Sequence, residues 1–235
     1  MQRLVLLLIV AAAPFLVSAQ NLQLHYDLRH TVAPDQNARN FTTIYFEYWK
    51  KQQDSGRSFI KPGSFLFKTE ADLYGTRDNI GKFFLQLSQS LRFWKPRVYL
   101  ALQYSGGAGI TEPKQYSYYI SNTFSAGVEY PFQWKGIYFT SQLYLRYTSA
   151  SVDPLFTLYW WKGLLHYKLE IAGDFSIWTD KGAGGKKLFF FFAEPQLWYR
   201  LLPQLSVGSK INLYYPENTN NLLQVAPTIA VRWKL

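Results

Sequence analysis

The sequence contains no cysteine and only one methionine in 235 residues. The absence of cysteine excludes the disulfides on which small exported domains often depend, and it excludes metal sites built on thiolates. After residue 19, no stretch approaches the roughly 20 consecutive apolar residues that a membrane-spanning helix requires. The chain must therefore build its fold without disulfides and without a helical membrane span.

The first 19 residues have the features of a secretory signal peptide. Arg3 supplies the positive charge, residues 4–13 are apolar, and Val17-Ser18-Ala19 provides small residues for cleavage. The apolar segment is too short to span a bilayer and is followed by polar sequence, and no lipobox cysteine follows it. We expect a cleaved signal peptide at 1–19 and one domain at 20–235, exported to the bacterial outer membrane.

Aromatic residues and basic charge are both abundant. Aromatic side chains make up 19% of the chain, with 18 Tyr, 18 Phe and 8 Trp, and the formal net charge is +10. A lipid-facing surface with aromatic belts would use such rings. The basic residues are interspersed rather than clustered, so we expect no nucleic-acid partner. Lipopolysaccharide phosphates outside, or anions inside a lumen, are better partners for this charge.

Residues 165–178 show the main pattern of the chain. Leu165, Tyr167, Leu169, Ile171, Gly173, Phe175 and Ile177 occupy one parity, and His166, Lys168, Glu170, Ala172, Asp174, Ser176 and Trp178 occupy the other. Successive side chains of a strand point to opposite faces, so one face is apolar and the other is charged. A segment of this length is typical of a barrel wall between lipid and water.

The same alternation recurs along the chain and predicts an all-β fold, a transmembrane antiparallel up-and-down β-barrel. We expect twelve strands, at 22–30, 40–50, 64–74, 81–93, 97–104, 117–131, 137–148, 154–161, 164–178, 187–200, 204–215 and 223–235. Pro195 and Pro227 fall within two of these strands, where each removes a ladder donor, so we expect a bulge at each.

The connections alternate between short turns and longer polar loops. Short turns are expected at 94–96, 133–136, 162–163 and 201–203, and loops at 31–39, 105–116, 179–186 and 216–222. Outer-membrane barrels place short turns in the periplasm and longer loops outside. The long connection at 51–63 departs from this alternation.

Tryptophan gathers at the short-turn end of the expected strands. The residues are Trp49, Trp94, Trp134, Trp160, Trp161, Trp198 and Trp233. Amphipathic rings settle at the level of lipid headgroups, so an interfacial belt is favoured over the core of a soluble sandwich. Val231, Trp233 and Leu235 alternate at the C-terminus, which resembles the terminal strand read by the outer-membrane assembly machinery. An ordinary edge strand remains the alternative for that segment.

The opening N-L-Q-L-H-Y-D at residues 21–27, together with twelve expected strands, resembles the Tsx-like family of outer-membrane proteins. The resemblance covers the architecture of the whole mature chain, and no nucleoside-contacting position can be aligned. It implies a monomeric twelve-stranded channel for nucleosides, with membrane lipid and lipopolysaccharide around it.

Ionisable residues of both signs are expected to face the lumen. They are His25, Asp27, Arg29, Glu47, Lys68, Glu70, Asp72, Arg92, Arg97, Glu129, Arg146, His166, Lys168, Glu170, Asp174, Glu194, Arg200, Lys210 and Arg232. Two interpretations stay open. The charges form structural ion pairs, since buried charges must be paired or hydrated, or they line a water-filled path and set its selectivity.

Aromatic residues share the same inward parity. They are Tyr45, Phe84, Tyr99, Tyr138, Tyr144, Phe190, Phe192 and Trp198. Rings of this kind stack on a planar base or sugar, with about 1–3 kcal/mol per base. They also fill a narrow barrel, and the sequence does not separate the two roles.

Catalysis is not expected, and neither a cofactor nor a metal is. An outer-membrane phospholipase needs a serine and a histidine together on the lipid-facing wall, and His25, His30 and His166 have no such serine partner in a recognisable motif. A selective channel for small solutes, nucleosides first, is the leading hypothesis. The alternatives are a closed structural or adhesive barrel plugged by its own ion pairs and, third, a lipid-active enzyme.

Overall fold

The computed structural model describes residues 19–50, 60–111, 116–181, 185–217 and 222–235. The expected signal peptide, except Ala19, and most of the 51–63 connection lie outside these ranges. The strands are β1 (Ala19–Asp27), β2 (Phe41–Lys50), β3 (Lys61–Leu73), β4 (Lys82–Arg92), β5 (Tyr99–Ile110), β6 (Ser117–Trp134), β7 (Ile137–Tyr147), β8 (Val152–Leu164), β9 (Leu169–Lys181), β10 (Lys187–Ala193), β11 (Gln196–Arg200), β12 (Leu205–Glu217) and β13 (Leu222–Lys234). Two short helices are α2 (Arg29–Val32) and η1 (Thr76–Asp78).

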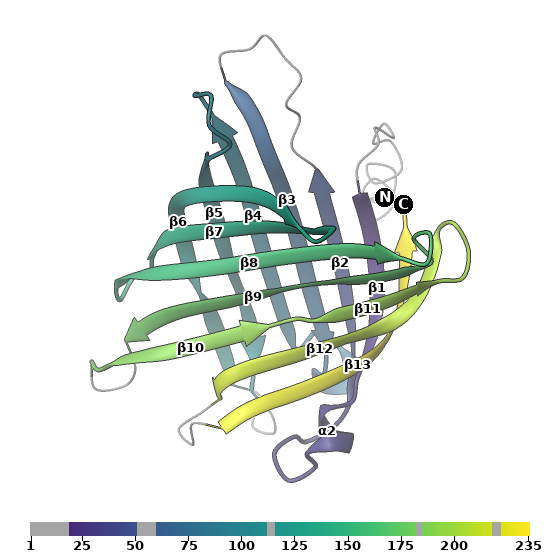
Figure 1. The fold of residues 1–235 in the computed structure, drawn as a ribbon. Coiled ribbons are helices and arrows are strands. Elements are labelled where there is room, and N and C mark those ends of the chain that lie inside the picture. Colours follow the sequence, from purple (N-terminus) through teal and green to yellow (C-terminus); the bar gives the residue numbers. More distant parts are fainter. Residues whose placement is uncertain (1–18, 51–59, 112–115, 182–184, 218–221) are drawn as a thin grey trace, which may run out of the picture.

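These strands form one closed antiparallel barrel (Figure 1). Each strand pairs with its neighbours in sequence, and β1 closes the sheet on β13. β10 and β11 both pair with β9 on one side and β12 on the other, so they are two halves of one strand. The barrel therefore has twelve spans, which confirms the predicted fold class and strand number.

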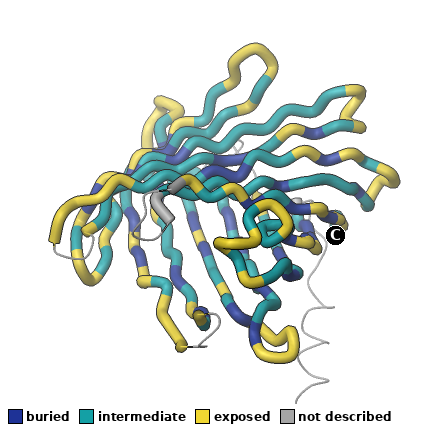
Figure 2. Tube along the Cα trace, turned by 90° about the horizontal axis from the view of Figure 1, so that it is seen from below, coloured by how far each residue is buried: buried dark blue, intermediate teal, exposed yellow. Residues whose placement is uncertain are grey.

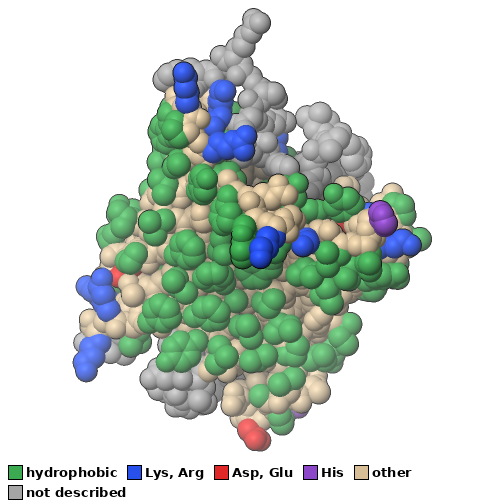
Figure 3. Space-filling view, in the orientation of Figure 1, with side chains coloured by type: hydrophobic (Ala, Val, Ile, Leu, Met, Phe, Trp, Pro, Cys, Tyr) green, Lys and Arg blue, Asp and Glu red, His purple; other side chains and the backbone are tan. Residues whose placement is uncertain are grey.

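The alternation predicted from the sequence separates the two faces of the wall. In β1, Leu22, Leu24 and Tyr26 are 43–53% exposed, whereas Gln23 and His25 are at most 3% exposed. Buried and exposed positions alternate along many strands (Figure 2). Hydrophobic side chains cover most of the outer wall on the face seen in Figure 3. The molecule thus buries polar groups inside and presents apolar ones outside, the reverse of a soluble protein.

The two ends of the barrel differ. β1 begins and β13 ends at one end of the barrel, and α2 lies at the other (Figure 1). The end where β1 begins carries the turns after β4, β6, β8 and β11, and we call it the short-turn end. The opposite end is the loop end. The Lys135-Gly136 turn joins β6 to β7 with φ angles of 50° and 76°, as a two-residue type I′ hairpin requires.

The turn between β8 and β9 corrects one predicted boundary. We expected a turn at 162–163 and a strand from residue 164, but β8 continues to Leu164 and β9 begins at Leu169. The chain reverses at residues 165–168, with positive φ at Leu165, His166 and Tyr167. Apolar and polar residues alternate in L-H-Y-K at 165–168 as they do in a strand, although these residues form a turn. From Leu169 onward the predicted phase is correct.

Other boundaries also move. β5 extends to Ile110, so residues 105–110 of the expected 105–116 polar loop are strand, and the Gly106-Gly107 segment lies close to neighbouring strands. An alanine Cβ at position 107 would come within 2.1 Å of the Phe83 carbonyl oxygen. The structure uses these glycines for close strand approach.

The two strand prolines behave differently. At Pro195 the ladder is interrupted between Ala193 and Gln196, as expected for a residue without an N–H. At Pro227 the predicted bulge is wrong, because the β12–β13 register continues unbroken from Gly208–Ala230 to Ile211–Pro227. The Leu28 N–H donates to the Pro227 carbonyl at 2.9 Å, and proline has no N–H to return the bond. Pro227 thus lies where the pairing of β1 ends.

The tryptophans at the short-turn end divide into three groups. Trp49, Trp94, Trp134 and Trp233 are exposed, as an interfacial belt requires. Trp160 and Trp161 are half-buried, and Trp198 is fully buried inside the barrel. No helix within the described residues is long and apolar enough to cross a membrane.

Candidate functional site in the barrel lumen

Charged side chains from five strands, and one from the link between β10 and β11, meet in the middle of the barrel, in a layer that we call the waist. It comprises Glu47 of β2, Lys68, Glu70 and Asp72 of β3, Lys82 of β4, Asp174 of β9, Glu194 between β10 and β11, and Lys210 of β12. Lys210 Nζ lies 3.0 Å from Glu194 Oε1 and 3.7 Å from Glu70 Oε2. Lys68 Nζ lies 3.5 Å from Glu194 Oε2. These ion pairs join strands far apart around the wall and therefore cross the lumen.

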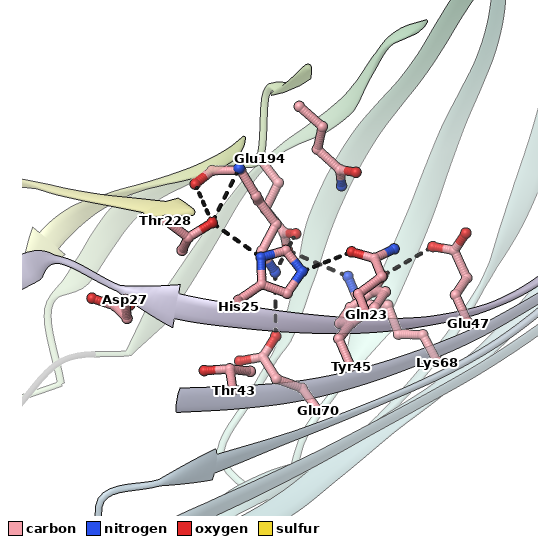
Figure 4. A network of polar contacts seen from close by, with 12 residues as sticks. Gln23, His25, Asp27, Thr43, Tyr45, Glu47, Lys68, Glu70, Glu194 and Thr228 are labelled. Carbon is pink, nitrogen blue, oxygen red and sulfur yellow. Dashed lines mark hydrogen bonds and ion pairs between the residues drawn. The ribbon is translucent and has the colours of Figure 1, made fainter. Parts of the chain in front are cut away.

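A hydrogen-bonded histidine borders the waist (Figure 4). His25 Nδ1 is 3.0 Å from Thr228 Oγ1, and His25 Nε2 is 2.7 Å from Gln23 Oε1. The Thr228 hydroxyl in turn donates to the Lys210 carbonyl at 3.0 Å. His25 also packs edge-on against the rings of Tyr45 and Trp198. Both ring nitrogens are thus engaged, and the histidine holds β1, β13 and β12 together.

A second part of the waist contains fewer cations. Tyr45 donates its hydroxyl to Glu47 Oε2 at 2.9 Å, and Asn21 donates to Glu47 Oε1 at 3.2 Å. The β8–β9 register places Tyr159 opposite Asp174. The pairing of β9 with β10 and β11 places Asp174 opposite Glu194, whose N–H donates to the Asp174 carbonyl at 2.8 Å. Two carboxylates therefore lie side by side on the inner wall.

At the short-turn end, one carboxylate holds three cations. Glu170 accepts from Arg232 at 2.7 Å, from Lys234 at 2.8 Å and from Arg200 at 3.3 Å. The Arg232 guanidinium also lies 4.6 Å from the ring centroid of Trp198, which it covers. This cluster, which we call the basic mouth, carries more positive than negative charge.

A buried carboxylate on the β6 wall is satisfied by neutral groups. Ser64 donates to both oxygens of Glu129 at 2.8 Å, Ser90 donates at 2.9 Å and Gln142 at 2.7 Å. Three donors, one of them shared between both oxygens, compensate for the burial of this carboxylate. The Ser64–Glu129 contact joins β3 to β6 across part of the lumen.

Near the loop end, rings line the inner wall between charged pairs. Trp178 and Phe190 are stacked with centroids 5.5 Å apart, and Phe192 contacts Tyr214 edge-on. Arg146 pairs with Asp180 at 2.9 Å and lies over Trp178 at 6.0 Å. These rings are only partly buried.

Most ionisable residues predicted for the lumen are found there. Buried or half-buried on the inner wall are His25, Asp27, Glu47, Lys68, Glu70, Asp72, Arg92, Glu129, Arg146, Glu170, Asp174, Glu194, Arg200, Lys210 and Arg232. Arg29 lies in α2 rather than in a strand, and its guanidinium turns back to pair with Asp27.

Three of the predicted residues are not in the lumen. His166 and Lys168 lie exposed in the turn between β8 and β9, and Arg97 lies exposed in the turn before β5. In each case the predicted strand ran past the residue at which the chain reverses. The inward parity assigned to these residues was therefore wrong.

The predicted inner rings fall into two classes. Tyr45, Tyr99, Tyr144 and Trp198 are at most 2% exposed. Lys210 covers Tyr45 at 4.7 Å and Arg92 covers Tyr99 at 5.1 Å, so these two rings, like Trp198, already have a cation over one face. Phe84, Phe190 and Phe192 are half-buried. Tyr138 belongs to neither class, because it lies exposed at the start of β7, packed against Trp161.

Sequence reasoning missed several inner residues. Lys82 and Lys234 share the parity of the inward positions of their strands, which was sufficient to identify them. Trp178 shares the parity of Glu170 and Asp174, so the pattern placed it inside, although it was not counted among the ligand-stacking rings. Tyr159 was missed for another reason: the run L-Y-W-W has large apolar side chains on both parities, so the pattern does not distinguish inside from outside there.

The closed wall, apolar outside and charged within, defines an outer-membrane-type β-barrel, a class that contacts membrane lipid. Within this class, residues 19–235 match the family model described as "Domain of unknown function (DUF5020)", and the chain belongs to that family. No curated protein matches the sequence.

Solved structures with a similar fold include both porins and an enzyme. The KdgM porin is 6% identical, with a TM-score of 0.50 over 92% of this chain and 99% of that one. The NanC porin is 10% identical, with a TM-score of 0.51 over 92% and 100%. Outer membrane phospholipase A from Escherichia coli is 9% identical, with a TM-score of 0.52 over 95% and 93%. At these identities the likeness defines the fold and leaves the function open.

Proposed function

We propose that this protein is a narrow, substrate-selective channel for small solutes in the bacterial outer membrane, and that it is not an enzyme. The observation that carries the proposal is the charged inner wall, built from nearly every strand and enclosed by an apolar exterior. A wall of this kind is required where water and solute must pass lipid. The similar fold of the KdgM and NanC porins agrees with it.

A channel in the outer membrane would place each part of the barrel in a different environment. The short-turn end faces the periplasm and the loop end faces outward. Lipid and lipopolysaccharide contact the exposed apolar wall, and the chain is exported by its signal peptide. β13, with Trp233 exposed on its outer face, is recognised by the assembly machinery. We propose a monomer, since each edge strand of the sheet is already paired with the other.

The solute is the finer part of the proposal, and nucleosides are the first candidates. The protein's own cations already cover the rings at the waist. A solute would therefore stack on the half-buried rings nearer the loop end. Phe190, Phe192, Trp178 and Tyr214 line that region, with Arg146 and Asp180 as polar neighbours. A planar base stacks on such faces, and neighbouring charges bind its hydroxyl and amide groups.

The histidines support the absence of catalysis. His25 is buried and bonded to Thr228 and Gln23, His30 contacts the Asn37 carbonyl at 2.6 Å, and His166 lies in a turn. A hydrolase of lipids needs a histidine that activates a serine at the lipid-facing wall. None of these three has a hydrogen bond to serine within the described residues.

Planar-bilayer conductance and liposome swelling test the channel. Purified protein should give discrete conductance steps, and swelling should be faster with nucleosides than with sugars of similar size. Lys68→Ala removes a side chain that crosses the lumen to Glu194 and should increase conductance. Lys135→Ala, in the exposed β6–β7 turn, is the control and should leave conductance unchanged. The channel is refuted if no conductance appears for wild type and Lys68→Ala alike.

A closed structural barrel is the second candidate, and the contacts across the lumen favour it. Lys68–Glu194 at 3.5 Å, Gln86–Tyr159 at 3.4 Å and Ser64–Glu129 at 2.8 Å occupy the lumen at three places. A structural plug of this kind predicts that Lys68→Ala lowers stability while conductance stays at zero.

A further inference from the structure

The described part of the waist has an unequal charge balance. Five carboxylates, from Glu47, Glu70, Asp72, Asp174 and Glu194, meet only three ammonium groups, from Lys68, Lys82 and Lys210. Lys82 Nζ lies 3.2 Å from Glu70 Oε1 and 3.2 Å from Asp72 Oδ2, so it forms ion pairs with both carboxylates. Lys68 and Lys210 are both within 3.5 Å of Glu194. The negative charge left over therefore belongs to Glu47 and Asp174.

Asp174 differs from Glu47 in its bonding. Glu47 accepts hydrogen bonds from Tyr45 and Asn21. The Asp174 side chain is nine-tenths buried, yet its carboxylate makes no hydrogen bond or ion pair with any described residue. Lys68, Lys210, Glu194 and Glu47 are the charged groups that act on it most strongly, and none of them is its bonded partner. The Asp174 oxygens are not among the fully buried polar atoms of the described residues, so a donor that enters the lumen can reach them and supply the missing hydrogen bond.

The immediate neighbours of Asp174 determine which donor fits. Glu194 lies directly opposite Asp174 across one strand pair, but Lys68 and Lys210 already pair with it, so the Asp174 carboxylate is the acceptor left for an incoming donor. Tyr159, half-buried, lies opposite Asp174 on the other side and adds an aromatic ring. A carboxylate beside a ring is the surrounding that a protonated amine prefers. No group of three metal-ligating side chains occurs in the described ranges, which disfavours a divalent metal at this position.

We propose that Asp174, with Glu194 and Tyr159, is a binding site for a positively charged nitrogen, and that the solutes selected at the waist are small amines. This inference rests on the proposed channel function, and at the waist it replaces neutral nucleosides with molecules that carry a protonated amine as the solute class selected. The positive nitrogen takes the place of the missing partner of Asp174, while Lys68 and Lys210 stay paired with Glu194. The basic mouth then lies beyond this site on the way to the periplasm.

The first test is ion selectivity in a planar bilayer with a gradient of methylammonium chloride. Wild type should prefer methylammonium over chloride by about tenfold, which corresponds to about 1.4 kcal/mol. Asp174→Asn should lower that preference about three- to tenfold, and Asp174→Glu should retain it. Asp78→Asn, which removes the same charge from an exposed site at the loop end, is the control.

The second test does not need conductance, so the two proposals fail separately. Methylammonium at ten times its Kd should raise the thermal midpoint of the folded gel band of wild type and Asp174→Glu by about 3–6 °C. Asp174→Asn should show no such rise. A conducting protein whose selectivity and midpoint are unchanged by Asp174→Asn would overturn the amine site and leave the channel standing. A thermal response without conductance would overturn the channel alone.

Discussion

Glu170→Gln is the sharpest test of how the lumen charges stabilise the barrel. The substitution keeps the shape of the side chain and removes the one carboxylate that Arg232, Lys234 and Arg200 share at 2.7, 2.8 and 3.3 Å. Glu170 and Arg232 are both buried, and breaking such a pair costs about 3–5 kcal/mol because the remaining charge is uncompensated. Lys234 and Arg200 are more than 30% exposed and add at most about 1 kcal/mol each.

The free energy of unfolding should therefore fall by about 3–6 kcal/mol. The measurement is a urea titration of the barrel refolded in lipid vesicles, followed by tryptophan fluorescence, with the midpoint shifted and the slope unchanged. A double variant, Glu170→Gln with Arg232→Met, removes the buried cation as well and should recover most of the loss. Asp78→Asn breaks the exposed pair with Arg39, at 3.3 Å, and should cost less than about 1 kcal/mol.

Two outcomes would refute this reasoning. If Glu170→Gln costs no more than Asp78→Asn, the basic mouth is hydrated and its ion pairs contribute nothing measurable. If the double variant is as unstable as the single one, the loss comes from Glu170 itself and not from an orphaned guanidinium.

The other predictions concern the outer wall and strand packing. Leu143→Arg places a charge on the exposed outer face in the middle of β7 and should lower the free energy of unfolding in vesicles by about 2–4 kcal/mol. Leu201→Arg, in a turn at the short-turn end, should lower it by at most about 1 kcal/mol. Equal losses for the two variants would mean that no lipid contacts the wall. Gly127→Ala brings a Cβ to 1.9 Å from the Leu143 carbonyl oxygen and should cost about 3 kcal/mol, measured by the same urea titration. At Gly136 the backbone has a φ of 76° and an added Cβ would meet no atom within 4 Å. Gly136→Ala should therefore lower the free energy of unfolding by only about 1–2 kcal/mol, from backbone strain. A larger loss than that of Gly127→Ala would contradict the close strand packing at Gly127.

The fold could be read from the sequence because one physical rule governs every strand. Lipid outside and polar groups inside force period-two alternation. Residues 22–28 show it without exception, and residues 169–177 show it except at Ala172 and Gly173. The rule fails at reversals. L-H-Y-K at 165–168 alternates as a strand would, yet the chain turns there with three left-handed residues. No local pattern distinguishes those four residues, since their conformation follows from the lengths of β8 and β9.

The site was less predictable than the wall. Parity assigns a residue to the inner face, but it does not reveal its partner across the lumen. Lys68 and Glu194 are 126 positions apart and meet at 3.5 Å because the barrel closes. Asp174 was one of many inward charges in the sequence. Its isolation is visible only when Lys68 and Lys210 are seen to pair with Glu194 instead.

The same cations explain why ring content alone misleads about ligand stacking. Tyr45 and Trp198 point inward as predicted, but Lys210 and Arg232 lie over them at 4.7 and 4.6 Å. Each of these cations also holds a carboxylate, Glu194 or Glu170, so the ring, the cation and the acid form one unit. A solute that stacked on either ring would have to displace a buried, paired charge, at a cost of several kcal/mol. The Asp174 carboxylate belongs to none of these units, so it is the group at the waist that can bind a solute.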